Sequence, residues 1–438
     1  MKNKNIAVIG LGFVGLSLVA VLSSKGYKVI GIDKNKNKCN SIINKKIPFY
    51  EKDLDVYIKR GFKNGLRIQS NFFEIEKCDI IFICVGTPQK NNGDIDLSMI
   101  KDVSREIGKC IKITRKKPTI FIKSTVIPGT AQKIIKPIVS KISGKKPGVD
   151  YDIFSNPEFL QETTAIRDTE NPHMVVIGYQ NKKFLKIAYN FLKKIHPNTS
   201  IIITNHQTSE MIKYANNSFL ATKISFINQL SNICQKIPGS NIDDIANAIG
   251  LDPRIGNLFL NAGPGYGGSC LPKDINAIIN LSKNLGVEPT LFNAVEKTNQ
   301  FQIKNIMDII ERNCGNLKNK KISILGLAFK PETDDIRDSI SIKIIKKLLI
   351  TNATIYVHDP KALDNTKEIF GKKINYSKSV KECLEDSNCC LILTGWKEYS
   401  KIKDNHIRIM NKRIIIDTRR ILSISKSKCE YIGLGIGN

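Results

Sequence analysis

One short stretch of the chain brings together a thiol, an ammonium group and a carboxylate. Cys270 ends a glycine-rich segment, residues 263–269, and Lys273 and Asp274 follow it. Glycines let a loop bend tightly and allow a ligand to approach its backbone. A nearby cation favours a thiolate and a carboxylate can carry protons, so the grouping suits a nucleophilic cysteine. A glycine-rich surface turn that ends in a buried cysteine is the alternative interpretation.

A second motif, near the amino end, has the spacing of a dinucleotide-binding turn. Gly10, Gly12 and Gly15 lie between a predicted strand and an apolar helix, and the next strand ends at Asp33. The glycines would let a pyrophosphate approach the positive end of the helix. Asp33 follows at roughly the 20 residues expected for a carboxylate that binds the ribose hydroxyls. It favours NAD over NADP, although Lys38 lies nearby.

Polar residues follow the later predicted strands of this region. Thr87 and Thr125 each come directly after a buried strand, and Glu158 and Glu162 follow the next one. In an open parallel sheet, ligands bind beyond the carboxyl ends of the strands, so we expect these side chains to line the cofactor cleft. A carboxylate there could position or activate water. Acidic residues are also favoured at helix N-termini without any catalytic role.

From about Thr204 the pattern changes to a long helix. Thr204 and Gln207 have the spacing of a capping box. Lys213 and Asn217 are four residues apart and therefore share one face. Such a pair is ordinarily solvated surface, but this helix leads toward the cysteine loop.

The last third of the chain contains an imperfect copy of the first motif. Gly326 follows a predicted strand, but Phe329 and Lys330 come next where later glycines would be. This half should therefore bind a nucleotide differently, with Lys330 as a point charge for phosphate. Residues 333–339 are expected to cap a helix. We predict an α/β protein with two Rossmann-like doubly wound domains joined by a long central helix.

The composition describes a globular protein with an excess of basic residues. The chain has 438 residues, of which 41% are hydrophobic and 25% are charged, enough for two or three domains. The formal net charge of +28 could indicate nucleic acid, a membrane surface or anionic small molecules as partners. The lysines are scattered among Asn and Ile, so a general compositional bias explains the charge equally well.

Cysteine usage and the apolar runs limit the class of protein further. The 11 cysteines and 5 histidines form no Cys-x-x-Cys pair or Cys/His cluster, so we expect no metal site. A reducing cytosol fits best, and we expect a cytoplasmic protein. The apolar run 6–22 contains the nucleotide-binding glycines and is not a signal peptide, and no other run predicts a membrane span.

Seven motifs, taken together and in order, resemble the nucleotide-sugar 6-dehydrogenases, the UDP-glucose and GDP-mannose dehydrogenase family. The resemblance covers essentially the whole chain. The motifs are Gly10 to Gly15, Val85-Gly86-Thr87-Pro88, Ser124-Thr125, Asn156 to Glu162, Lys213 to Asn217, Gly267-Gly268-Ser269-Cys270, and Phe329-Lys330 through Arg337. It implies an NAD-binding domain at residues 1–203, a central helical domain with the catalytic loop at 204–312, and a UDP-sugar-binding domain at 313–438.

The family oxidises the sugar C6 alcohol to a carboxylate in two NAD-dependent steps. The resemblance implies that Cys270 captures the aldehyde as a thiohemiacetal, which becomes a thioester that water hydrolyses. The residues implied to assist deprotonation and to steady the oxyanion are Lys213, Asn217 and Asp274. The residues that match positions linked to the water and the hydrolysis step are Glu158 and Thr125.

The resemblance also implies binding residues for the cofactor and for the nucleotide sugar. Arg254 matches an arginine that reaches the sugar of a neighbouring subunit, which implies a homo-oligomer, a dimer at least. The cofactor set is Gly10, Gly12, Phe13, Val14, Gly15, Asp33, Lys38, Thr87, Thr125, Glu162, Lys273 and Arg337. The substrate set is Glu158, Phe159, Leu160, Glu162, Lys213, Asn217, Arg254, Phe259, Leu260, Asn261, Gly263, Gly267, Lys330 and Arg419.

Branch-level motifs favour UDP-glucose as the substrate. The Gly-Gly-Ser-Cys form and the segments 254–257 and 417–420 resemble the UDP-glucose branch, whereas 91–96 and 143–146 resemble GDP-mannose dehydrogenase. GDP-mannose and a UDP-N-acetylhexosamine are the alternatives. The chain departs from the UDP-glucose branch at Pro48 to Leu54 and at Tyr266, where phenylalanine is usual.

Two readings from other classes stay open. A basic nucleic-acid-binding protein would explain the charge but would leave the cysteine loop and the carboxylates without a purpose; we expect no nucleic-acid and no membrane partner. A plain two-electron dehydrogenase would release an aldehyde and give the thiol no role.

Overall fold

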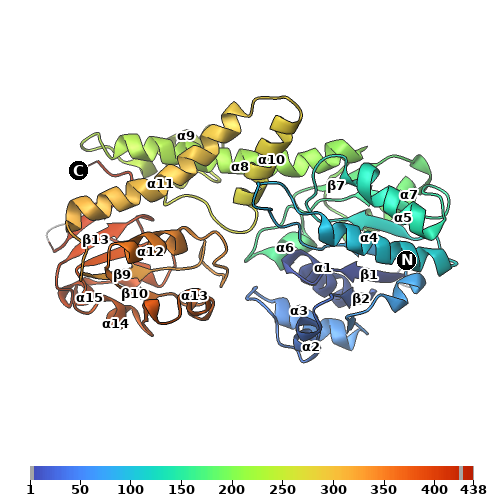
Figure 1. The fold of residues 1–438 in the computed structure, drawn as a ribbon, viewed down its shortest axis with the longest axis horizontal. Helices are drawn as coiled ribbons and strands as arrows, with labels where there is room; N and C mark the ends of the chain where they lie inside the picture. Colours follow the sequence, from blue (N-terminus) through green and yellow to red (C-terminus); the bar gives the residue numbers. More distant parts are fainter. Residues whose placement is uncertain (1–3, 424–427, 438) are drawn as a thin grey trace. The chain divides into compact units, whose positions relative to one another are not determined.

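The computed structural model describes residues 4–423 and 428–437. These residues form two compact units, residues 1–216 and 217–438, which are described separately below. Each unit contains one sheet surrounded by helices (Figure 1). The predicted α/β architecture is confirmed, whereas the division into three domains at residues 203 and 312 stays a prediction.

The first unit is built on an eight-stranded sheet. Its order is β3-β2-β1-β4-β5-β6-β7-β8, in which the first six strands are parallel and have the Rossmann order. β7 meets β6 antiparallel and pairs in parallel with β8. The strands are β1 Asn5–Ile9, β2 Lys28–Ile32, β3 Arg67–Gln69, β4 Ile80–Ile83, β5 Thr119–Ile122, β6 Asp152–Ser155, β7 Val175–Tyr179 and β8 Ile201–Asn205.

Helices cover the sheet of the first unit and bury its apolar strands. α1 is apolar along its length and buried, as expected for a helix that follows a dinucleotide-binding turn. Phe82 of β4, Phe121 of β5 and Phe191 of α7 lie in ring contact within one hydrophobic core. The helical elements are α1 Phe13–Ser24, α2 Lys36–Ile43, α3 Leu54–Lys63, η1 Phe73–Lys77, α4 Ser98–Ile113, η2 Ala131–Ile135, α5 Lys136–Ser143, α6 Ala165–Glu170 and α7 Lys182–Ile195.

The long helix α8 spans His206–Cys234, and the boundary between the two units falls within it. The predicted Thr204–Gln207 capping box is wrong. Thr204 belongs to β8, which runs to Asn205, and the Asn205 side chain accepts a hydrogen bond from the Thr208 amide at 2.8 Å. The strand therefore continues until the residue that caps the helix.

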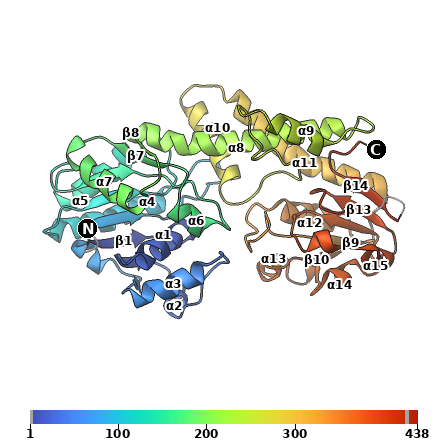
Figure 2. The same cartoon turned by 180° about the vertical axis from the view of Figure 1, so that it is seen from behind.

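The second unit contains a six-stranded parallel sheet with the order β11-β10-β9-β12-β13-β14. In chain order this is the complete Rossmann arrangement, with helices packed around it (Figures 1 and 2). The strands are β9 Lys321–Leu325, β10 Thr354–His358, β11 Asn375–Tyr376, β12 Cys389–Ile392, β13 Ile414–Asp417 and β14 Glu430–Gly433.

Helices α9 to α11 precede this sheet in the chain and α12 to α15 alternate with its strands. They are α9 Ile242–Gly250, α10 Leu271–Asn284, α11 Thr290–Cys314, α12 Ile340–Ile350, α13 Leu363–Phe370, α14 Val380–Leu384 and α15 Asp404–Arg408, with the short turns η3 Gly371–Lys373 and η4 Tyr399–Lys401. Ser339 precedes α12, but its hydroxyl donates to the Leu327 carbonyl at 2.6 Å instead of capping the helix. Side-chain capping from residues 333–339 is thus not what starts α12.

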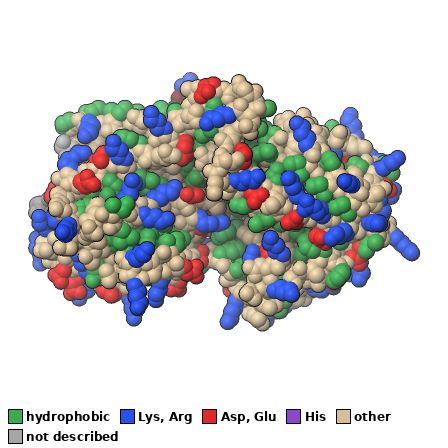
Figure 3. Space-filling view, viewed as in Figure 1, with side chains coloured by type: hydrophobic (Ala, Val, Ile, Leu, Met, Phe, Trp, Pro, Cys, Tyr) green, Lys and Arg blue, Asp and Glu red, His purple; other side chains and the backbone are tan. Residues whose placement is uncertain are grey.

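The surface and the apolar helices add two observations. On the face drawn in Figure 3, Lys and Arg side chains are spread over both units rather than gathered on one element. Across the described parts of the chain, no helix is both long and apolar enough to cross a membrane.

Candidate active site

The three glycines of the first turn have different physical roles. Gly10 has φ +95, and a Cβ there would lie 2.7 Å from the Cys84 carbonyl carbon; a Cβ at Gly15 would lie 1.7 Å from the Gly10 oxygen. These two glycines let backbone segments pack together. A Cβ at Gly12, by contrast, would meet no protein atom within 4 Å. The space beside Gly12, at the start of α1, fits the pyrophosphate of a dinucleotide.

Asp33 lies at the end of β2 and is oriented by this turn. Its Oδ2 accepts hydrogen bonds from the Leu11 amide at 3.0 Å and from Lys38 Nζ at 2.9 Å, and its Oδ1 accepts from the Asn35 amide. Burial raises the pKa of Asp33, but the bonds from Asn35, Lys38 and Leu11 outweigh it and hold the pKa below its usual value. The carboxylate is therefore ionised and fixed where a ribose would bind.

The next two strand ends are joined directly. The Thr87 hydroxyl donates to the Thr125 carbonyl at 2.7 Å, and the Ser124 hydroxyl donates to the Val85 carbonyl at 2.7 Å. Thr87 is buried and Thr125 is half-buried. The predicted proximity of Thr87 and Thr125 is thus present in the structure.

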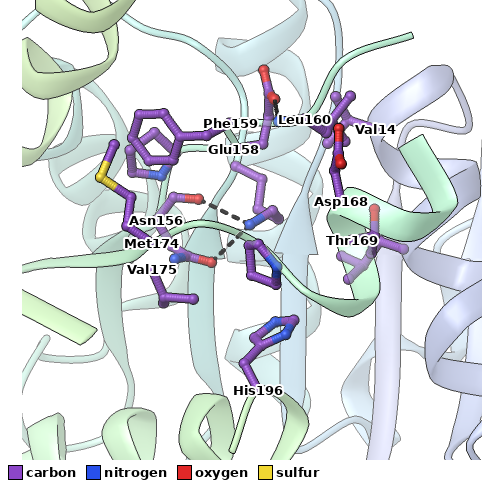
Figure 4. A pocket seen from close by; sticks show the side chains of 14 residues that line it. Val14, Asn156, Glu158, Phe159, Leu160, Asp168, Thr169, Met174, Val175 and His196 are labelled. Carbon is purple, nitrogen blue, oxygen red and sulfur yellow. Dashed lines mark hydrogen bonds between the residues drawn. The ribbon is translucent and has the colours of Figure 1, made fainter. Parts of the chain in front are cut away.

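Glu158 and Lys213 form an ion pair within the first unit. Lys213 Nζ lies 2.9 Å from Glu158 Oε1, with 5% and 10% of the two side chains exposed. Glu158 Oε2 accepts from the Leu160 amide at 2.8 Å, and Lys213 Nζ lies 5.5 Å from the centre of the Phe159 ring. We call Glu158, Phe159, Leu160 and Lys213 the Glu158 cluster. Figure 4 shows Glu158, Phe159 and Leu160 together above a small pocket.

Cys270 is the exposed cysteine of the chain, and every other cysteine in the described ranges is buried. It is the N-cap residue of α10, and its Sγ lies 3.6 Å from the Ser269 hydroxyl. The positive end of a helix stabilises a thiolate. The alternative of a buried, inert cysteine at the end of the glycine loop is therefore wrong.

Asp274 lies on the first turn of α10 and is almost fully buried. Its Oδ2 accepts from Asn217 Nδ2 at 2.6 Å, and its Oδ1 forms an ion pair with Lys273. These contacts join α10 to α8 within the second unit. We call Asn217, Cys270, Lys273 and Asp274 the Cys270 cluster. Since Lys213 and Asn217 lie four residues apart on α8, that helix carries one residue of each cluster.

The glycines of the cysteine loop are occupied by protein contacts. A Cβ at Gly267 would lie 2.4 Å from the Asp338 oxygen, and one at Gly268 would lie 2.8 Å from the Phe329 ring. The Gly268 amide also donates to the Arg337 carbonyl at 3.0 Å. These glycines thus bring the loop against the segment after β9, in addition to any approach of a ligand.

The second Rossmann motif differs from the first in a way that excludes the same mode of dinucleotide binding. Asp359, at the end of β10, accepts from the Leu327 and Ala328 amides and from the Trp396 indole on one oxygen, and it is buried. No helix follows the turn directly, because α12 begins only at Ile340. The predicted difference in nucleotide binding is consistent with this geometry.

Two adjacent arginines after β13 have separate tasks. Arg420 forms two hydrogen bonds with Asp243, at 2.8 and 2.9 Å, and donates to the carbonyls of Ala262 and Leu434. Arg419 donates from Nε to the Leu393 carbonyl, and its guanidinium borders Gly263. Burial and the Arg420 charge lower the pKa of Arg419 to about 10. Arg420 is structural, which leaves Arg419 as the cation for an anionic ligand.

The remaining predicted residues lie in varied surroundings. Arg254 is exposed and paired with Asp252, and Arg337 is paired with Asp335. Phe259 has φ +66, and Leu260 packs in a hydrophobic cluster, so that only its backbone faces away from the core. Of the others, Asn261 is exposed, Glu162 is half-buried, and Lys330 Nζ lies 5.6 Å from the Phe329 ring centre.

Three buried polar residues near these clusters were not singled out from the sequence. Glu51 accepts from the Thr163 and Ala165 amides and so holds the start of α6. Lys123 donates to Asn156 Oδ1 at 3.0 Å. Lys123 alone had a sequence signal, because it ends a predicted strand next to Ser124 and Thr125.

Glu210, on the first turns of α8, is the third of them. Its carboxylate accepts from the Gly129 amide at 2.6 Å, the Ala131 amide at 3.1 Å and the Ser155 hydroxyl at 3.0 Å. Burial raises the pKa of Glu210 to about 7, against the effect of these hydrogen bonds. Glu210 thereby ties α8 to the loop after β5.

This raised pKa predicts a stability that depends on pH. The folded protein keeps a proton that the unfolded chain releases between the ordinary pKa of 4.5 and about 7. This group's contribution to stability is therefore full below that window and falls by about 3 kcal/mol as pH rises through it. Glu210→Gln removes the slope. Urea unfolding at about pH 5 and about pH 8 should show the variant gaining on the wild type with rising pH; a difference that is the same at both pH values would contradict the assignment.

Comparisons with known proteins account for the whole arrangement. Models of the UDP-glucose/GDP-mannose dehydrogenase family match the NAD-binding domain at residues 4–198, the central domain at 207–301 and the UDP-binding domain at 323–424. The chain belongs to this family. It is an NAD-dependent nucleotide-sugar 6-dehydrogenase, and the expected cofactor, NAD, is confirmed by the match of the NAD-binding domain.

Individual relatives are similar over their full lengths. UDP-glucose 6-dehydrogenase TuaD of Bacillus subtilis is 39% identical, with 99% of this chain and 93% of the relative covered. UDP-glucose 6-dehydrogenase AglM of Haloferax volcanii is 37% identical, with 95% and 97% covered. A UDP-glucose dehydrogenase structure from Pyrobaculum islandicum matches with a TM-score of 0.90 and 30% identity, covering 99% of this chain and 98% of that one.

Proposed function

We propose that the chain is a UDP-glucose 6-dehydrogenase that produces UDP-glucuronate. The observation that carries the proposal is Cys270, an exposed thiol at the start of α10, whose first turn holds Asp274 between Asn217 and Lys273. A nucleophilic cysteine is what distinguishes a four-electron oxidation from a simple alcohol dehydrogenase. The choice of UDP-glucose is supported by full-length relatives that carry this name.

In the proposed reaction, Lys213 and Asn217 donate hydrogen bonds to the C6 oxygen and stabilise negative charge on it. When bound, NAD would accept one hydride in each oxidation. The Cys270 thiolate attacks the aldehyde carbon and forms a thiohemiacetal, so that no reactive aldehyde is released. Its oxidation leaves a thioester on Sγ. Water then attacks this carbonyl, the C–S bond breaks, and the carboxylate and the free thiol result.

We propose distinct tasks for the two clusters. Asp274, buried and bonded to Asn217 and Lys273, fixes these groups for work at the substrate oxygen. Glu158, ion-paired to Lys213, orients the hydrolytic water, together with Thr125. Because a thioester mechanism requires a reduced thiol, we also propose a cytoplasmic location.

For the nucleotide sugar, we propose that Lys330 and Arg419 bind the phosphates. Backbone groups of Phe259, Leu260 and Gly263, with Asn261 and Gly267, would border the sugar and the base, as the resemblance implies. We propose that Phe13, Val14, Lys38, Thr87, Glu162 and Arg337 complete the cofactor contacts around Gly12 and Asp33.

The test is the number of NADH molecules formed per sugar consumed, with UDP-glucose, GDP-mannose and UDP-N-acetylglucosamine compared under identical conditions. We expect two NADH per UDP-glucose, and a uronate as the product. Two NADH from another nucleotide sugar only would retain the mechanism and refute the substrate. One NADH with a free aldehyde would refute the thioester mechanism.

We also propose that the enzyme is a homo-oligomer whose interface includes α8. Phe219, Phe226 and Ile233 recur at intervals of seven residues on this helix and are 65%, 54% and 47% exposed. An apolar stripe of this kind is typical of a helix packed against a partner. Arg254, which is exposed, would then reach the neighbouring subunit's substrate.

Phe226→Asp is expected to shift the enzyme toward the monomer, because a carboxylate would be buried without a partner in such an interface. Analytical ultracentrifugation at a series of concentrations measures the shift. Ile350→Asp, at an 80% exposed site on α12, is the matched control and should leave the mass unchanged. An unchanged mass of Phe226→Asp would refute the role of this stripe.

A further inference from the structure

The ion-paired Glu158 is supported from behind by a buried ammonium group. Lys123 follows β5, and its Nζ donates to Asn156 Oδ1 at 3.0 Å and to the Asn156 carbonyl at 3.4 Å, the dashed bonds of Figure 4. Burial lowers the pKa of Lys123, while the nearby Glu158 carboxylate opposes that shift. The family resemblance assigns no role to this lysine.

Asn156, the partner of Lys123, is held by three strands. It follows β6 and is 1% exposed. Its amide donates to the Ile122 carbonyl of β5, and its Nδ2 donates to the Val176 carbonyl of β7 at 2.8 Å. The β6–β7 contact is the antiparallel junction of the sheet, with a single residue pair, so the backbone ladder supports it weakly. Side-chain bonds at Asn156 therefore fix where β6 ends.

The position of Asn156 is transmitted to Glu158 over two residues. Pro157 lies between them and has a restricted backbone, so a change at Asn156 would move Glu158 rather than be absorbed by the chain. Loss of Lys123 would leave Asn156 Oδ1 buried without its donor, which favours a rearrangement of the loop.

A cavity of about 40 Å³ adjoins this ammonium group. Its lining includes Lys123, Asn156, Glu158, Thr169 and His196. Burial, the Lys123 charge and other contacts lower the pKa of His196 to about 4, so this imidazole stays neutral. Lys123 is thus the positive charge of the lining, and the cavity has room for a water or another small polar group.

We propose that Lys123 is a positioning residue that holds Glu158 in place for hydrolysis of the thioester. It acts through Asn156 and does not touch the substrate. This inference rests on the function proposed above. Loss of Lys123 should therefore slow the step that needs Glu158, and spare nucleotide-sugar binding and the first oxidation.

The test compares Lys123→Met, Lys136→Met and Glu158→Gln by rapid-quench kinetics with UDP-glucose. Lys136 is the matched control: it is also a buried lysine of the first unit, but it lies near Asp152 at the first residue of β6, the other end of that strand. We expect Lys123→Met to accumulate the Cys270 thioester and to lose about tenfold or more in the hydrolysis rate, with KM and the first NADH burst within about twofold of wild type. Lys136→Met should hydrolyse the thioester at the wild-type rate.

A smaller side chain gives a second readout if Lys123→Met does not fold. Lys123→Ala leaves a space continuous with the cavity, and methylammonium should restore its hydrolysis rate, whereas tetramethylammonium should not. Hydrolysis within about twofold of wild type in Lys123→Met, or an equal loss in every kinetic step, would overturn the proposal. Glu158→Gln separates the two levels, because normal hydrolysis in that variant would instead refute the proposed role of Glu158.

Discussion

Cys270→Ser is expected to abolish uronate formation by this enzyme while leaving its fold and its affinity for the nucleotide sugar unchanged. A serine hydroxyl is a far poorer nucleophile than a thiolate at neutral pH and forms an ester that this site is not built to hydrolyse. Because Cys270 is exposed and N-caps α10, the substitution disturbs no core contact. We expect kcat to fall by on the order of 10⁴-fold or more, measured as NADH formation with UDP-glucose.

Two controls accompany this prediction. Ser269→Ala removes the hydroxyl 3.6 Å from the thiol and should retain most of the activity. Iodoacetamide should modify about one thiol per wild-type chain and inactivate it in parallel, because the other cysteines in the described part of the chain are buried. Uronate formation by Cys270→Ser, or an alkylated wild type that stays active, would mean that another group is the nucleophile.

Gly12→Ala and Gly15→Ala are expected to fail in opposite ways. A Cβ at Gly12 meets no protein atom, and its φ of −81 suits alanine, so Gly12→Ala should fold normally. Its methyl group would occupy the space proposed for the pyrophosphate, and we expect the Kd for NAD to rise at least about tenfold. At Gly15 the Cβ would overlap the Gly10 oxygen, so Gly15→Ala should lose about 3 kcal/mol or more of stability.

Thermal unfolding and NAD titration of each variant separate the two effects. The expected result is a Tm near that of wild type with weak NAD binding for Gly12→Ala, and a lowered Tm for Gly15→Ala. If Gly12→Ala bound NAD as tightly as the wild type, the cofactor would not approach the backbone at that glycine.

Features that depend on local spacing could be predicted from the sequence. The strand, glycine turn, helix and Asp33 of the first motif all lie within one β-α-β unit, where chain connectivity leaves little freedom. Cys270 and Asp274 are four residues apart, so a helix start puts both on the same turn. The resemblance of seven motifs in order then identified the family.

Features that depend on contacts between distant segments became visible only in the tertiary structure. Lys123 and Asn156 follow different strands, and their bond exists because β5 and β6 are neighbours in the sheet. Thr204 looked like a helix cap because nothing local showed that β8 would continue to Asn205. The glycines at 267 and 268 suggested an open loop for a ligand.

The sequence by itself determined the fold class, the two nucleotide-type motifs and the reactive thiol, because these follow from residue type and short-range spacing. The tertiary structure decided which of those groups are held in place and by what. It showed that Gly267 and Gly268 pack against residues after β9, that Asp359 is occupied by its own backbone, and that Glu158 is paired with Lys213. The physical reason is that burial and hydrogen-bond partners are set by packing between segments far apart in the chain, which residue spacing does not encode.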